Sequence, residues 1–217
     1  MYHPTLEQVE ELAGQGNLVP VYREINADLE TPVSAYLKVA RPPYSFLLES
    51  VEGGERIARY SFLGTEPVKI IKTGPGQEEG AVDPLLPVKR ELSRFQVAGG
   101  ETDHTRFNGG AVGYISYDAV KYFERLPTPD HDPLDLPESV FMLSTTFLVF
   151  DHLRHKIRVV SYAHLDVDVA RAYADAVERI DELVSRLESP IIHPSTHRTE
   201  GEVAGVSSNM TRTQYEE

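Results

Sequence analysis

Residues 46–64 have the sequence FLLESVEGGERIARYSFLG, in which two short apolar runs flank the pair Gly53-Gly54. The first run, residues 44–48, is mostly aromatic and aliphatic, as expected of a strand that is buried on both faces. Residues 58–63 repeat that character after the glycines. The stretch therefore predicts two neighbouring strands with a connection between them, around which the rest of the fold is arranged.

Side chains that can bind a ligand lie where these predicted strands end. Glu49 and Ser50 follow the first strand, whereas Arg59, Tyr60 and Ser61 open the second. If the strands pair, a carboxylate, two hydroxyls, a guanidinium and a phenol meet at one end of a sheet. Such a group suits an amino-acid zwitterion, because carboxylates and hydroxyls accept from an ammonium and arginine binds a carboxylate with two hydrogen bonds.

The same residues also fit a simpler interpretation. Glu49 or Glu55 can form a solvated pair with Arg59 across the strands, with no ligand involved.

A resemblance to a known family favours the ligand-binding interpretation over the solvated ion pair. The strings LLES at 47–50, GGE at 53–55 and RYSFLG at 59–64 resemble the amino-terminal region of anthranilate synthase component I, and residues 20–24 and 28–38 resemble the opening of the same family. In that family the LLES segment belongs to the tryptophan feedback site and not to the active site. The resemblance implies that L-tryptophan binds here as an allosteric inhibitor, with Ser50 at the position of the feedback-site serine. The implied tryptophan-binding residues are Ser50, Glu49, Arg59, Tyr60 and Ser61.

Composition excludes several classes of protein. The chain has 217 residues, 41% of them hydrophobic, which is enough for one large domain or a domain with an appendage. Its 21 Lys and Arg residues face 34 Asp and Glu residues, and this net charge of -13 argues against nucleic-acid binding. The absence of cysteine excludes disulfides, thiolate metal sites and cysteine nucleophiles.

The amino terminus carries no export signal. It lacks a basic segment followed by an apolar one, and no apolar run approaches the roughly 20 residues that span a bilayer. We therefore expect a soluble, cytoplasmic protein without a membrane partner.

Periodicity and capping signals predict an α+β fold of mixed, mostly antiparallel sheets in a sandwich-like arrangement covered by helices, as the resemblance also implies. Capping boxes and apolar spacing predict helices at residues 6–12, 32–40, 84–95 and 167–187. Strands are expected at residues 18–25, 44–48, 58–63, 67–73, 109–115, 145–151 and 156–161.

Residues 107–118, FNGGAVGYISYD, form a second informative string. Three glycines remove side chains from a strand pattern, so that another backbone, a ring or a ligand can approach closely. They do not open a helix, which excludes a dinucleotide-binding loop, and the glycines at 74–80 lack the order of a phosphate-binding loop. The string at 107–118 resembles a second segment of anthranilate synthase component I. Asp130, His131 and Asp132 are neighbours in a loop and are not expected to bind a metal.

Three parts are predicted along the chain. Residues 1–189 correspond to the family's amino-terminal regulatory domain, residues 190–208 to a linker or exposed loop, and residues 209–217 to the start of its chorismate-binding catalytic domain. Thr211 and Gln214 announce a helix that is cut short. The family's catalytic and magnesium-binding residues would lie beyond Glu217, so we assign no catalytic residue, metal ligand or cofactor to this chain. Without that second domain, apolar surface at 109–115 and 167–187 is expected to face solvent.

The resemblance implies a part of the enzyme that converts chorismate to anthranilate, the first step of tryptophan biosynthesis, together with a glutamine amidotransferase subunit, component II. This part is expected to be inactive alone. Two alternatives stay open: the corresponding part of aminodeoxychorismate synthase component I, and a free-standing ligand-binding module. The LLES and RYS strings favour the first enzyme, and the interrupted helix at Thr211 argues against the module.

Overall fold

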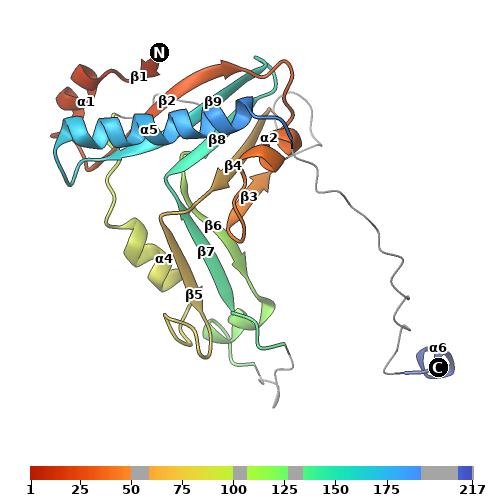
Figure 1. The fold of residues 1–217 in the computed structure, drawn as a ribbon. Helices are drawn as coiled ribbons and strands as arrows, with labels where there is room; N and C mark the ends of the chain where they lie inside the picture. The colour runs from red at the N-terminus through yellow and green to blue at the C-terminus, as the bar shows by residue number, and fades with distance from the viewer. Residues whose placement is uncertain (50–58, 100–106, 127–133, 192–209, 217) are drawn as a thin grey trace.

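The computed structural model of the chain describes residues 1–49, 59–99, 107–126, 134–191 and 210–216. It contains two antiparallel sheets, and a long helix lies across the larger of them (Figure 1). The combination confirms the predicted α+β class.

The six-stranded sheet consists of β1 (Tyr2–His3), β2 (Leu18–Asn26), β3 (Ser45–Leu48), β4 (Tyr60–Thr65), β8 (Thr146–Asp151) and β9 (Lys156–His164). Its strands lie in the order β1-β2-β9-β8-β4-β3. The three-stranded sheet consists of β5 (Lys69–Thr73), β6 (Gly110–Ile115) and β7 (Ser139–Ser144), in the order β5-β7-β6. All of these strand pairs are antiparallel, and a parallel bridge joins Leu18 to Val97.

The helices are α1 (Leu6–Leu12), α2 (Pro32–Val39), α4 (Leu85–Leu92), α5 (Val169–Glu188) and α6 (Arg212–Glu216), with a 3-10 helix η1 at Tyr117–Tyr122. Capping boxes start three of them; those at Thr5 and Thr211 were predicted, whereas at α2 the sequence predicted only the start at Thr31 with Pro32 in the first position. Thr5 and Gln8 satisfy each other's backbone amides at α1, and Thr31 and Ser34 do so at α2, where Pro32 occupies the first position. Thr211 and Gln214 cap α6 in the same way.

The main core lies between α5 and one face of the six-stranded sheet. Apolar side chains at intervals of three and four residues face the sheet from α5: Ala172, Ala176, Ile180, Leu183, Val184 and Leu187. They meet side chains that alternate along the central strands, including Val21, Leu148 and Val159. The expectation that residues 167–187 would expose an apolar surface is therefore wrong, because that surface is already covered. On β6, by contrast, Tyr114 and Ile115 are exposed.

The carboxyl ends of α2 and α5 are joined by reciprocal hydrogen bonds, in which a cationic side chain of each helix donates to a backbone carbonyl of the other. Lys38 of α2 donates to the carbonyl of Leu187 at 2.8 Å, and Arg186 of α5 donates to the carbonyl of Val39 at 3.3 Å. Arg186 also pairs with Glu66, which follows β4. Terminal helix carbonyls lack partners within their own helix, so each cation satisfies the other helix and opposes its dipole.

Three strands differ from the sequence-based expectation, and the first of them, the two-residue β1, was not predicted. β7 was not predicted, although only Thr145 separates it from β8, so that one nearly continuous stretch crosses from the smaller sheet into the larger one. β3 is an edge strand and is not fully buried: Phe46 is buried, Leu47 is only partly buried, and Leu48 at the end of the strand is 43% exposed.

At two positions a neighbouring group lies so close to the backbone that only glycine fits. Gly113 pairs with Phe141 of β7, and a Cβ atom on Gly113 would lie 1.9 Å from the carbonyl oxygen of Val140. A Cβ atom on Gly64 would lie 2.3 Å from the ring of Phe46. The prediction that the glycines of residues 107–118 admit a neighbouring backbone is confirmed at Gly113.

We expect Gly113→Ala to destabilise the fold by about 1 to 3 kcal/mol, because the new methyl group meets backbone that cannot move aside alone. The melting temperature should fall by about 2 to 4 °C per kcal/mol in a protein of this size. Gly14→Ala is the matched control, since a Cβ atom there has no neighbour within 4 Å. Equal melting temperatures for the two variants in a circular-dichroism melt would contradict this account.

Candidate functional site

Four of the five predicted ligand-binding residues are described, and they lie at one end of the six-stranded sheet. β3 pairs with β4 so that Leu48 lies opposite Phe62. Glu49 therefore follows the last pair on one strand, while Arg59, Tyr60 and Ser61 precede it on the other, as the sequence suggested. Ser50, the feedback-site serine of the resemblance, lies outside the described residues.

The strand pleat divides these residues between the two faces of the sheet. Ser61 is opposite Phe150, which belongs to the core under α5, and Ser61 itself is fully buried. Tyr60 is opposite Asp151 and packs with Phe62 on the other face. The hydroxyl of Ser61 and the phenol of Tyr60 are thus brought to the same end of the sheet but not to the same surface.

Arg59 has a partner that sequence reasoning did not identify. Its Nε and Nη2 atoms donate to the two carboxylate oxygens of Asp151 at 3.1 and 2.6 Å, and its guanidinium stacks 4.8 Å from the centre of the Tyr60 ring. Burial disfavours the charged form of Asp151, but hydrogen bonds from Arg59 and from the backbone of Arg154 outweigh that effect and lower the pKa of Asp151. The fork of Arg59 is therefore occupied by a carboxylate of the chain itself.

Ser61 also has a partner, in the turn that follows Asp151. Its Oγ atom lies 2.8 Å from Nε2 of His152, and the backbone N–H of His152 donates to the carbonyl of Arg59 at 2.9 Å. The sequence suggested that His152 is simply an exposed turn residue. Its surface position is as expected, but its ring is tied to a buried serine.

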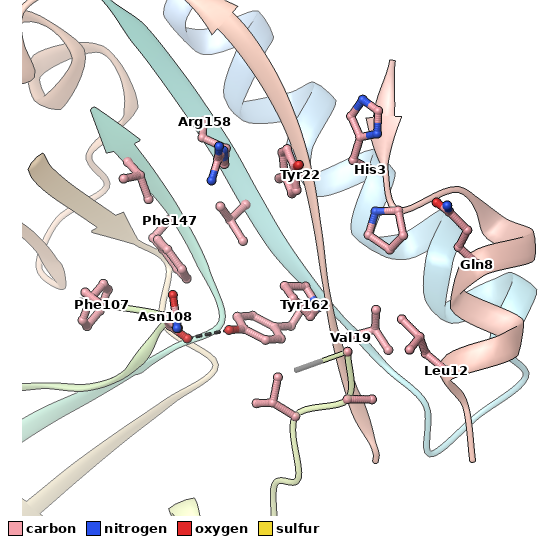
Figure 2. Close-up of a pocket in the computed structure, with 17 residues that line it drawn as sticks. His3, Gln8, Leu12, Val19, Tyr22, Phe107, Asn108, Phe147, Arg158 and Tyr162 are labelled. Atoms are coloured by element: carbon pink, nitrogen blue, oxygen red, sulfur yellow. Dashed lines mark hydrogen bonds between the residues drawn. The ribbon is translucent and has the colours of Figure 1, made fainter. Parts of the chain in front are cut away.

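A pocket of about 500 Å³ opens on the sheet face opposite α5 (Figure 2). Phe147, Val149 and Val160 line it from β8 and β9, and polar side chains such as Gln8 and Arg158 also reach it. The hydroxyl of Tyr162 donates to the carbonyl of Asn108 at 2.5 Å, and burial raises the pKa of Tyr162 to about 12. Sequence reasoning missed this pocket because its lining comes from segments that only the tertiary fold brings together.

Aromatic rings connect the sheet end with the pocket. Phe62 lies 5.1 Å from Phe107, Phe107 lies 5.3 Å from Phe147, and Phe147 lies 6.5 Å from Tyr162, measured between ring centres. Tyr60 continues the series at 6.3 Å from Phe62. Apolar and aromatic surface of the kind that an indole ring needs is therefore present beside the predicted residues.

The described part of the chain has no cluster of three acidic or histidine side chains placed to hold a metal ion. The magnesium that the resemblance implies for the family therefore finds no fitting set of ligands there. Asp130, His131 and Asp132 lie outside the described residues. Within those residues, no helix combines the length and apolar character needed to cross a membrane.

A family model and several related proteins match this chain, and they agree on one family. Residues 43–217 match the family described as "chorismate binding enzyme". Anthranilate synthase component 1 of Acetivibrio thermocellus is 38% identical over 190 residues, covering 83% of this chain and 38% of the relative. A probable anthranilate synthase component 1 of Schizosaccharomyces pombe is 41% identical over 198 residues, covering 88% of this chain and 39% of the relative. That of Synechocystis is 34% identical over 243 residues, covering 99% and 46%.

A solved structure shares the fold. The crystal structure of anthranilate synthase component I from Streptococcus pneumoniae superposes with a TM-score of 0.51 at 24% identity, covering 76% of this chain and 37% of that one. This chain thus spans less than half the length of the relatives it matches.

The lowered pKa of Asp151 predicts a stability effect that depends on pH. The ionised carboxylate stabilises the fold above its ordinary pKa of 3.8, and this contribution is lost as the pH falls through the lower folded value. Asp151→Asn should therefore lower the melting temperature near pH 7, and the difference from wild type should narrow toward about pH 3. Asp28→Asn, at an exposed turn, is the control. A difference that stays constant with pH would show that the charge of Asp151 is not what matters.

Proposed function

This chain belongs to the chorismate binding enzyme family, and we propose that it is the amino-terminal, tryptophan-binding part of an anthranilate synthase component I. The observation that carries the proposal is the match along most of the chain to relatives of that name. The complete protein would convert chorismate to anthranilate with ammonia supplied by a glutamine amidotransferase, component II. These names favour anthranilate synthase over the related aminodeoxychorismate synthase.

The tryptophan site of this proposal lies at the sheet end that carries Glu49 and Arg59. Ser50 and Glu49 would contact the amino-acid group of the ligand, and Arg59, Tyr60 and Ser61 would complete or shape the pocket. The buried hydrogen bond of Ser61 and the occupied fork of Arg59 support a shaping role for these two residues. The neighbouring aromatic rings supply apolar surface for the indole.

The catalytic steps belong, in this proposal, to the part of the relatives that the chain does not span. We therefore expect the 217-residue chain to form no anthranilate when it is incubated with chorismate, magnesium and ammonia. Anthranilate fluorescence is the measurement, with an intact anthranilate synthase as the positive control. Activity that persists through repurification would place the active site within this chain and overturn the division.

The second test concerns Ser50. Loss of one hydroxyl hydrogen bond to a charged group costs roughly 1.5 to 3 kcal/mol, or about 10- to 150-fold in affinity. In the complete protein, Ser50→Ala should raise the tryptophan concentration needed for half-inhibition by that factor, while turnover without tryptophan stays nearly unchanged. An unchanged inhibition curve would remove Ser50 from the regulatory site.

The large pocket provides the control for this test. Val97 lines the pocket and is half-exposed, so Val97→Phe should narrow it without touching the sheet end. Inhibition should be unaffected in Val97→Phe. If Val97→Phe relieves inhibition and Ser50→Ala does not, tryptophan binds in the pocket instead.

A further inference from the structure

Three contacts join the start of β4 and the residue before it to the last residue of β8 and the turn that follows. Arg59 is held by both carboxylate oxygens of Asp151, the carbonyl of Arg59 accepts from the backbone N–H of His152, and Ser61 is hydrogen-bonded to the His152 ring. The Arg59 pair stacks beside Tyr60 on the face opposite α5, whereas the Ser61 pair lies on the face of the core under α5. The turn therefore holds the start of β4 from both faces of the sheet.

The turn is itself fixed, so it can act as a support. The Oδ1 atom of Asp151 accepts from the backbone amides of Leu153 and Arg154 at 3.1 and 3.2 Å, which closes the turn through its own side chain. Asp151 is only 15% exposed at its side chain, and Ser61 is fully buried. A carboxylate held by two amides and a bidentate guanidinium has little freedom to release its partner.

This arrangement bears on how a ligand can bind. A ligand carboxylate would have to displace Asp151 to reach the fork of Arg59, and Asp151 is tethered in place as a permanent competitor. Arg59 is consequently better suited to hold the strand end than to receive the ligand directly.

We propose that Asp151 and His152 are positioning residues of the regulatory site: through Arg59 and Ser61 they fix the strand end at which an amino acid is bound. The inference rests on the proposed function, because it takes that sheet end to be the tryptophan site. It adds the last residue of β8 and the first residue of the β8–β9 turn to the site, and makes Arg59 an indirect contributor.

L-Tryptophan itself is the probe for the binding test. The chain contains no tryptophan, so the anisotropy of added L-tryptophan, excited where the chain's tyrosines do not absorb, reports binding without background from protein tryptophan. Asp151→Asn should weaken binding by about fivefold or more, and Asp151→Glu, which keeps the charge, should recover part of the loss. Arg154→Gln is the matched control, because the Arg154 side chain is 65% exposed and its Nε atom lies 4.0 Å from Oδ2 of Asp151.

A double-mutant cycle separates support from direct contact. If Asp151 acts through Arg59 and Arg59 does not touch the ligand, then Arg59→Gln, Asp151→Asn and the double variant should lose similar amounts of affinity. If Arg59 binds the ligand carboxylate directly, Asp151→Asn should free the guanidinium and strengthen binding. Stronger or unchanged binding in Asp151→Asn, with wild type binding normally, would overturn the inference and leave the proposed function standing.

A measurement that needs no ligand tests whether Asp151 holds the turn and the start of β4 in place. Amide hydrogen exchange at His152, followed by NMR, should accelerate by about tenfold or more in Asp151→Asn, while exchange at Val159 in the core stays unchanged. Unchanged exchange at His152 would overturn the inference even if no tryptophan binds. Accelerated exchange in a chain that shows no tryptophan binding would overturn the role in the site, and would point to a failure of the proposed function.

Discussion

Burial of the apolar stripe of α5 on one face of the six-stranded sheet is the constraint on which the rest of the structure depends. Ile180 and Leu183 meet Leu148 and Val159 there, in a core that excludes water from the central strands. Because this packing occupies one face, the pleat sends every second side chain of the same strands to the opposite face. The pocket and the series of aromatic rings are consequences of that division.

The same division explains how one end of the sheet can be both rigid and available. Ser61 is on the packed side and contributes its hydroxyl to an internal hydrogen bond, whereas Tyr60 is on the other side among partly buried rings. A strand end with one residue fixed in the core and its neighbour near the surface is suited to presenting a ligand-binding edge. Residues that only support such an edge can affect affinity as strongly as residues that touch the ligand.

Local signals in the sequence predicted most of the elements, because capping and periodicity act within a few residues. Thr5 and Thr31 start their helices as expected, and the spacing along α5 identifies its buried side. β7 escaped detection because the expected strand began at residue 145, and the apolar residues 140–143 just before it were not assigned to a strand of their own. The partner of Arg59 escaped for another reason: Asp151 is 92 positions away, and only the pairing of β4 with β8 brings the two together. The sequence assigned the site residues to one end of the sheet, but which face each occupies depended on register.

The exchange of Lys38 and Arg186 between the ends of α2 and α5 has a mechanical consequence. α2 leads within a few residues into β3, the short edge strand that ends beside Glu49. A force applied to the segment after Glu188 would act first on the hydrogen bonds of Lys38 and Arg186. Through these bonds it would reach the end of α2, and from there β3. Because the two helix ends are bonded to each other, tension at the carboxyl end of α5 would be transmitted through α2 to the edge strand β3.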